Sequence, residues 1–249
     1  MMNPAEFANI AGSEQEFWWY RGMRRILFGM LDPLARGRTV RRALEAGCGT
    51  GHFTRELETR YGWPMFPLDL GWEGLVFGAQ MGIPRLLQAD ICAIPFPGDC
   101  FDAVVSMDVI VHLPRGEEDK PMREFARVLK PGGLFLIRVS ALDILRSHHS
   151  QFAQERQRFN KSRLTALAAR HGIRLLRCTY ANSLLMPVAL AKFRIWEPLS
   201  GKQPSSGVEP VAGWLDALLH APLAAEAALL RLGLNLPLGQ SLILLGEKA

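Results

Sequence analysis

Residues 45–51 read Glu45-Ala46-Gly47-Cys48-Gly49-Thr50-Gly51 and form a glycine-rich turn. The preceding segment, Val40 to Leu44, is typical of a short strand, and the following segment, Phe53 to Tyr61, is typical of a helix. A strand, a glycine-rich turn and a helix in this order bring backbone N–H groups and a helix N-terminus against a bound ligand. Because glycine has no Cβ, the ligand can approach the main chain of the turn closely.

The spacing of the glycines and the acid before them indicate which ligand the turn takes. Gly47, Gly49 and Gly51 follow a G-x-G-x-G pattern, whereas a dinucleotide fingerprint requires G-x-G-x-x-G and would place its third glycine at His52. Glu45 would repel the pyrophosphate of NAD, but it suits a cation. S-adenosylmethionine carries a sulfonium and an amino group, so it fits this turn better than NAD.

Four further segments follow the turn in a set order along the chain. They are Phe66–Leu70, which contains Asp69, then Gln88–Phe96, Phe101–Ser106 and Arg127–Gly133. Together with the turn, they resemble a class I S-adenosylmethionine-dependent methyltransferase of the type 11 family, which includes enzymes of ubiquinone and menaquinone biosynthesis. The resemblance covers roughly residues 15–180, and it implies S-adenosylmethionine as the cofactor.

Alternating strand and helix patterns predict an α/β fold, with a doubly wound, mostly parallel sheet covered by helices on both faces. The resemblance implies seven strands in a Rossmann-like arrangement. We expect strands over 40–46, up to Asp69, and over 85–89, 103–107, 134–139, 173–180 and 241–245, and helices over 14–34, 52–61, 73–81 and 117–129. Residues 1–13 are expected to be loose and 143–169 to be helix-prone, and Pro67 predicts a short or irregular second strand.

About 60 residues separate the last two predicted strands, far more than a hairpin loop needs. We therefore divide the chain into a core with an N-terminal helix (1–182), a helical insert (183–238) and a final strand (239–249). The insert is rich in Leu, Ala, Met and Trp. It is expected to cap a hydrophobic acceptor pocket, to pack on its own domain, or to mediate a homodimer or a peripheral membrane contact.

Composition narrows the classes of partner and location. The net charge of +5 would permit contact with nucleic acid, but no block of five like charges marks a nucleic-acid tail, so we expect no such partner. The four cysteines form no CxxC pair and no zinc pattern, so we expect reduced thiols, no metal site and a cytoplasmic protein. Neither a signal peptide nor an apolar run of membrane-spanning length is expected.

Several residues are predicted to hold the cofactor. Glu45 suits the amino group of the methionine moiety, and Asp69, 22 residues after Gly47, suits the ribose hydroxyls. The resemblance implies that Asp90 and the backbone of Ile91 take the adenine. The structural alternatives are a surface acid for Glu45, a helix cap for Asp69 and a turn aspartate for Asp90. Tyr20 and Arg21 are candidates to close over the cofactor carboxylate. The remaining predicted contacts are Gly47, Cys48, Gly49, Gly51, Leu70 and Met107.

Candidate catalytic and acceptor-pocket residues are histidines. A neutral His112 beyond the fourth strand could take a proton from a substrate hydroxyl, although a histidine at this place in many relatives looks structural. His148 and His149 are candidates for the acceptor pocket, with a solvated helix face as the alternative. Methyl transfer needs little beyond in-line positioning, because the sulfonium is already a good leaving group.

The predicted function is methyl transfer to a small or lipid-like acceptor by in-line displacement. O-methylation of a hydroxyl or carboxyl is the first hypothesis, and C-methylation of a quinone-like ring is the second. A cofactor-binding protein without transferase activity is the alternative from another class. An NAD-linked dehydrogenase is disfavoured by the missing third glycine.

Overall fold

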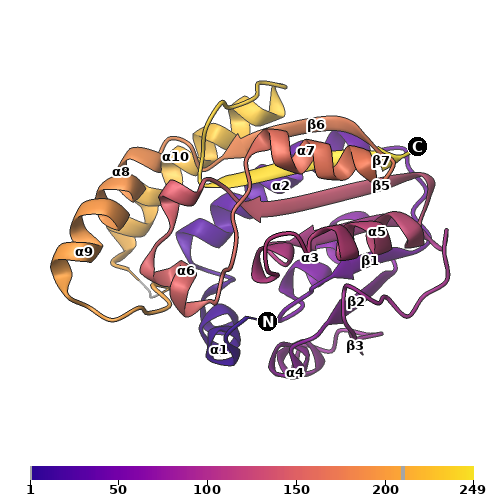
Figure 1. Ribbon diagram of the computed structural model, residues 1–249, viewed down its shortest axis with the longest axis horizontal. Helices are drawn as coiled ribbons and strands as arrows, with labels where there is room; N and C mark the ends of the chain where they lie inside the picture. Colours follow the sequence, from indigo (N-terminus) through magenta and orange to yellow (C-terminus); the bar gives the residue numbers. More distant parts are fainter. Residues whose placement is uncertain (1, 209–210) are drawn as a thin grey trace.

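The computed structural model describes residues 2–208 and 211–249, which form a seven-stranded sheet between two layers of helices (Figure 1). The strand order is β3-β2-β1-β4-β5-β7-β6, and within this sheet β7 runs antiparallel to both of its neighbours. The predicted fold class is therefore confirmed. The strands are β1 Ala43–Ala46, β2 Met65–Asp69, β3 Leu87–Gln88, β4 Phe101–Met107, β5 Leu129–Ser140, β6 Ile173–Ala181 and β7 Ser241–Lys248.

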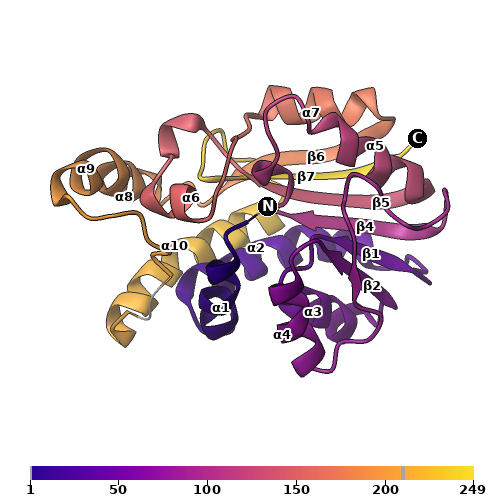
Figure 2. The same cartoon turned by 60° about the horizontal axis from the view of Figure 1, so that its bottom comes forward.

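Helices cover both faces of the sheet, and each layer buries its own hydrophobic cluster (Figure 2). On one face, α5 (Asp119–Val128) and α7 (Lys161–Arg170) bury Phe125 and Leu164. On the other face, α2 (Trp18–Ala35) and α3 (His52–Tyr61) bury Ile26 and Leu57. The carboxyl ends of β1, β2 and β4 meet at one edge of this sandwich, which is where open α/β sheets bind ligands.

The prediction that residues 1–13 are loose is wrong for residues 4–13, which form a helix, while Met1 lies outside the described residues. Pro4–Ser13 form α1, which begins at the cap residue Asn3, whose side chain accepts a hydrogen bond from the Ala5 N–H at 3.2 Å. Phe7 is buried and packs so closely that a Cβ on Gly71 or Gly74 would overlap its ring. Gly71 is the N-cap residue of the helix α4 (Trp72–Gln80), and Gly74 lies within that helix. A single inward aromatic produces no helical periodicity, which is why the sequence pattern missed this helix.

The helix-prone stretch 143–169 is broken in the structure. It contains the 3-10 turn η2 (Asp143–Leu145), α6 (His148–Phe152) and α7. Ser147 and Asn160 act as N-caps, and Gln154 between them has a φ of +59°. Polar capping residues therefore divide the stretch where helix propensity alone would continue it.

Pro67 lies inside β2 without disturbing its pairing with β1. The two-residue strand β3 pairs only with Leu68 and Asp69, so no neighbour on that side needs a donor from Pro67.

The insert between β6 and β7 has two parts. The first, which we call the arm, contains α8 (Met186–Ala191), the π-helical turn η3 (Lys192–Trp196) and α9 (Glu197–Ser200). The second is α10 (Gly213–Arg231), which packs along α2. Its Leu223 and Leu230 are buried in the same hydrophobic cluster as Ile26 of α2. A Cβ on Gly22 would overlap Leu223, so glycine lets these two helices approach closely. Within the described residues, no helix is long and apolar enough to cross a membrane.

Candidate active site

The glycine-rich turn is held in place by the end of β2. The N–H groups of Gly47 and Cys48 donate to the Leu68 carbonyl at 2.8 and 2.9 Å. Asp69 accepts from the Gly49 N–H at 2.8 Å and from the Gly71 N–H at 2.7 Å. Gly47 and Gly49 have φ angles of +84° and +56°, which L-residues with side chains rarely adopt. Asp69 therefore supports the turn, and it also lines the cavity beside it.

Three carboxyl groups surround this turn. Glu45 is buried, accepts a hydrogen bond from Thr54, and has its pKa raised to about 8 by burial and, to a smaller extent, by Asp69 and Glu14. Glu14 accepts from the Thr50 hydroxyl at 2.6 Å, and burial raises its pKa to about 7. The pKa of Asp69 is also raised, mainly by burial. A ligand that brings positive charge to these groups would relieve their mutual repulsion, so the turn fits the cationic methionine end of S-adenosylmethionine.

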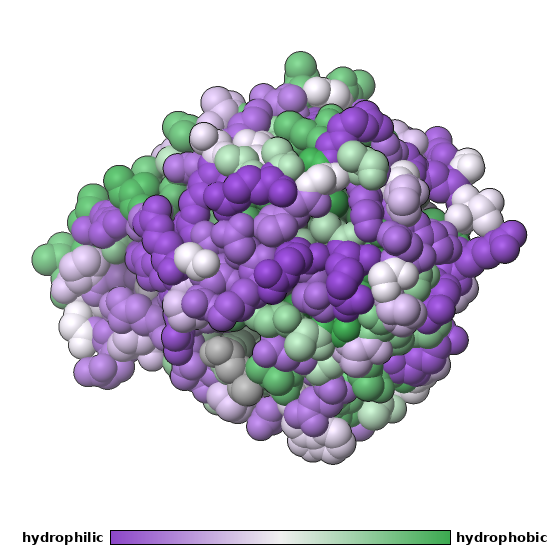
Figure 3. Space-filling model, turned by 45° about the vertical axis from the view of Figure 1, so that its right-hand side comes forward, coloured by the Kyte–Doolittle hydropathy of each residue, from purple (hydrophilic) through white to green (hydrophobic). Residues whose placement is uncertain are grey.

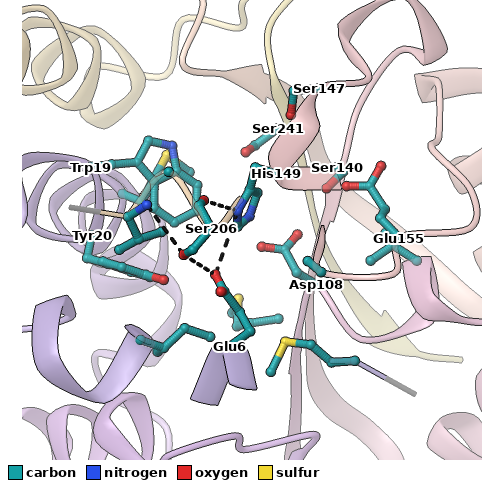
Figure 4. Close-up of a pocket in the computed structure, with 18 of the residues that line it drawn as sticks. Glu6, Trp19, Tyr20, Asp108, Ser140, Ser147, His149, Glu155, Ser206 and Ser241 are labelled. Atoms are coloured by element: carbon teal, nitrogen blue, oxygen red, sulfur yellow. Dashed lines mark hydrogen bonds and ion pairs between the residues drawn. The ribbon is translucent and has the colours of Figure 1, made fainter. Parts of the chain in front are cut away.

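A cavity of about 850 Å³ extends from the turn to the arm of the insert. It brings together most of the predicted site residues. Figure 4 labels two of them, Tyr20 of α2 and His149 of α6. The predicted residues that line it are Tyr20, Glu45, Gly47, Cys48, Gly49, Asp69, Leu70, Asp90, Ile91, Met107, His112, His148 and His149.

Two predicted cofactor residues, Arg21 and Gly51, are not among the described residues that line the cavity. The Arg21 guanidinium pairs with Asp216 of α10, so it joins two helices. Gly51 caps α3 with a φ of +81°, and a Cβ there would overlap Ile83. Glycine at position 51 therefore permits this backbone conformation and the close packing against Ile83. Arg24, one helical turn after Arg21, lines the cavity instead.

His112 lies in the 3-10 turn η1 (Ile110–His112), directly beyond β4. Its Nδ1 is 3.3 Å from the Gln154 carbonyl oxygen, and burial lowers its pKa. The neutral ring that donates its Nδ1–H to this carbonyl keeps Nε2 as a proton acceptor. The Gln154 carbonyl therefore sets the orientation of the His112 ring.

Sequence reasoning missed an ion pair at the sheet edge. Arg138 at the end of β5 pairs with Asp108, and its guanidinium lies 5.0 Å from the Trp19 ring centroid. All three residues line the cavity. Arg138 Nε and Asp108 Oδ1 are buried and have no hydrogen-bond partner among the residues the structure describes. The signal was a charged residue within the apolar run of a central strand, which is costly without a function or a partner.

A second missed group joins three distant segments. The buried carboxylate of Glu6 in α1 accepts a hydrogen bond from the Ser206 hydroxyl at 2.9 Å, and His149 Nδ1 lies 3.6 Å from it (Figure 4). Glu6 and Ser206 are 200 residues apart in the chain. All three residues line the cavity, and their contacts join segments too far apart in the chain for a local sequence pattern to predict them.

The insert contributes both apolar and polar residues to the cavity lining. Its large apolar residues there are Leu185, Val188, Phe193 and Trp196, and its polar residues include Lys192, Glu197, Ser200 and Lys202. The cavity thus has an acidic end at the glycine turn, a charged edge at Arg138 and Asp108, and an end at the arm where apolar side chains lie beside polar ones.

A glycine turn after β1, carboxylates at the ends of β1 and β2 and an antiparallel seventh strand define the class I methyltransferase fold. Residues 44–137 match the family model described as "Methyltransferase domain". This segment is a class I S-adenosylmethionine-dependent methyltransferase domain of the type 11 kind, as the sequence predicted. S-adenosylmethionine is the cofactor of the class, and the buried acids of the turn fit it.

Curated relatives match part of the chain. A probable S-adenosylmethionine-dependent methyltransferase of Mycolicibacterium smegmatis is 32% identical over 130 residues, which are 51% of this chain and 48% of the relative. The 2-methyl-6-phytyl-1,4-hydroquinone methyltransferase of Synechocystis is 31% identical over 44% of this chain and 34% of that protein. The match thus spans half or less of the length of these two relatives.

Solved structures share the fold over most of the chain. A putative sarcosine dimethylglycine methyltransferase of Galdieria sulphuraria has a TM-score of 0.60 at 19% identity, covering 91% of this chain and 86% of that one. A SAM-dependent methyltransferase of Archaeoglobus fulgidus also has a TM-score of 0.60, at 16% identity, covering 94% and 97%. The likeness therefore extends beyond the matched domain to the fold as a whole.

Proposed function

We propose that this chain transfers a methyl group from S-adenosylmethionine to the hydroxyl or carboxyl oxygen of a small hydrophobic or lipid-like acceptor. The observation that carries the proposal is the single cavity that joins the acidic glycine turn to the apolar arm. One end suits a cationic donor, and the other suits an apolar acceptor. His112, in the turn after β4, also lines this cavity.

In this proposal each group has a defined role. Glu45 binds the amino group of the cofactor, Asp69 binds its ribose, and Asp90 with the Ile91 backbone binds its adenine. When bound, the cofactor supplies an activated methyl on a good leaving group. The chain's own residues orient the acceptor in line with that methyl and exclude water, and His112 Nε2 accepts the acceptor's hydroxyl proton.

We propose that the insert both packs against its own domain and covers the acceptor pocket. Leu223 and Leu230 of α10 are buried against α2, which supports packing on its own domain. Val188 and Phe193 of the arm line the cavity, which supports a lid over the acceptor. Removing the whole insert would strip α2 of its cover, so the lid is better tested by substitutions in the arm.

C-methylation of a quinone-like ring is the second candidate, because the Synechocystis relative is a hydroquinone methyltransferase. Other relatives are named as a sterol C-methyltransferase and a malonyl-[acyl-carrier protein] O-methyltransferase. The family thus accommodates both bond types, and the product must decide between them.

The test uses trideuteromethyl-labelled S-adenosylmethionine and a panel of hydroxyl, carboxyl and hydroquinone compounds with apolar tails. A label on oxygen in a product supports the proposal, and a label on ring carbon supports the second candidate. Asp69→Ala is the control, since it should reduce turnover of every acceptor alike. Binding of S-adenosylhomocysteine without turnover of any panel member would favour a cofactor-binding protein without transferase activity.

A further inference from the structure

The arm exposes large apolar side chains along one side. Val188, Ile195 and Leu199 are 58%, 60% and 80% exposed, and their spacings of seven and four residues place them on one side of a helix. Leu184 and Trp196 flank this row and are also exposed. Hydrophobic side chains gather at the left edge of the space-filling view, where the arm projects (Figure 3).

The row continues onto a second segment. Arg194 of the arm donates from Nε to the Ile144 carbonyl at 2.7 Å, which ties the arm to the turn η2. Ile144 is itself more than half exposed. We call the combined surface the arm face; it consists of Ile144, Leu184, Val188, Ile195, Trp196 and Leu199. A cluster of this kind on two tied segments marks an interaction site more than a scatter of single residues does.

The charges around the arm face are mainly positive. Lys192 and Arg194 lie between the apolar positions of the arm and Lys202 follows them, and all three are exposed. Glu197, the acid of the arm, is buried and accepts a hydrogen bond from the His148 N–H at 2.8 Å. Asp143, beside Ile144, is exposed, and its Oδ1 lies 3.4 Å from Nε of Arg146. The arm itself therefore presents apolar groups within a basic rim.

The arm face is continuous with the cavity. Val188 and Trp196 belong to the face and also line the cavity, as do the basic residues Lys192 and Lys202. An apolar acceptor held in a layer against this face would therefore enter the cavity without crossing water.

We infer that the arm face docks the protein on the surface of an anionic lipid bilayer, from which the acceptor is drawn. This inference rests on the proposed function for the identity of the cargo, but the docking itself does not depend on catalysis. Apolar residues with tryptophan and a lysine-rich rim suit the boundary between headgroups and acyl chains. A second copy of the chain fits less well, because a two-fold contact on this face would bring the basic rims of both copies together.

The experiment measures co-sedimentation of the full chain with vesicles of phosphatidylcholine alone and with about one third phosphatidylglycerol. The chain is expected to bind the anionic vesicles, because each basic residue near the surface raises the affinity about fivefold. This affinity should fall steeply as the salt concentration rises. The apolar contribution is tested with the double variant Ile195→Ser/Leu199→Ser, whose residues are exposed and are not among the described residues that line the cavity. The matched control is Trp72→Ser, an equally exposed apolar residue on α4.

The double variant should lose at least tenfold in vesicle binding while its affinity for S-adenosylhomocysteine stays unchanged, and Trp72→Ser should bind vesicles like the native chain. Equal vesicle binding by the double variant and the native chain overturns the inference. So does a dimer in light scattering that the double variant dissociates, which would make a second copy the occupant. Vesicle binding without turnover of any acceptor would leave the docking surface standing and remove the proposed function.

Discussion

Glu45 offers the sharpest test of the cofactor site, because its carboxyl group must change its charge when a cation binds. With a pKa of about 8, it carries roughly 0.9 of a proton at pH 7 in the free protein. The amino group of a bound ligand would favour the ionised carboxylate, so binding should release up to about 0.9 of a proton from this group at pH 7. Affinity should then rise by up to about tenfold per pH unit below pH 8 and level off above it.

The assay is calorimetric titration with S-adenosylhomocysteine at pH 7 in buffers of different ionisation enthalpy, which counts the protons released. Glu45→Gln should remove most of the release and much of the pH dependence. Glu14→Gln is the matched control. Glu14 has a pKa of about 7 and accepts a hydrogen bond from Thr50 of the same turn, so its substitution should remove a smaller part of the proton release. If Glu45→Gln releases as many protons as the native chain, Glu45 does not face the amino group and the reasoning fails.

The same pKa affects stability in the absence of ligand. The unfolded chain ionises Glu45 near its ordinary pKa of 4.5, whereas the folded chain keeps the proton up to about pH 8. The folded state therefore binds more protons in this window, so the free energy of unfolding should fall as the pH rises from about 5 to 8. Denaturant titrations at several pH values check this, and Glu45→Gln should flatten the dependence; an identical slope in both proteins would contradict it.

Three further substitutions separate cofactor binding, catalysis and packing. Asp69→Ala should weaken S-adenosylhomocysteine binding by about 1–3 kcal/mol, because it removes a ligand contact and two supports of the turn; unchanged affinity would reduce Asp69 to a cap. His112→Ala should lower turnover about 10²-fold with cofactor affinity retained, and should abolish the fall in rate expected in the native chain at acidic pH, where the imidazole, whose pKa burial lowers, gains a proton; near-normal turnover would leave positioning as the catalytic device. Leu223→Ala should lower the free energy of unfolding by about 2–5 kcal/mol in urea titrations, and exposed Leu218→Ala on the same helix by less than about 0.5 kcal/mol; equal losses would show that α10 does not pack on α2 as described.

The features that the sequence determined by itself are those encoded in adjacent residues. The helix over 52–61 was predicted to the residue, because the glycine turn before it and Gly62 after it are local signals. The order of strands and helices, and the acids Glu45 and Asp69 at strand ends, follow from patterns a few residues long. These patterns sufficed for the fold class and for most of the residues that line the cavity at the glycine turn.

Tertiary structure alone decided which side chains meet across the cavity. Arg21 and Arg24 are equivalent in sequence terms, but Asp216 of α10, 195 residues away, pairs with Arg21, and Arg24 is the one that lines the cavity. Glu6 reaches Ser206 and Arg138 reaches Asp108 only because the packed sheet and helices bring distant segments within hydrogen-bond range. Such pairings depend on the sum of many weak packing contacts, which leave no periodic mark along the chain. The part of the cavity lining formed by Glu6, Ser206, Asp108 and Arg138 is built from them, and so it could be found only in the folded structure.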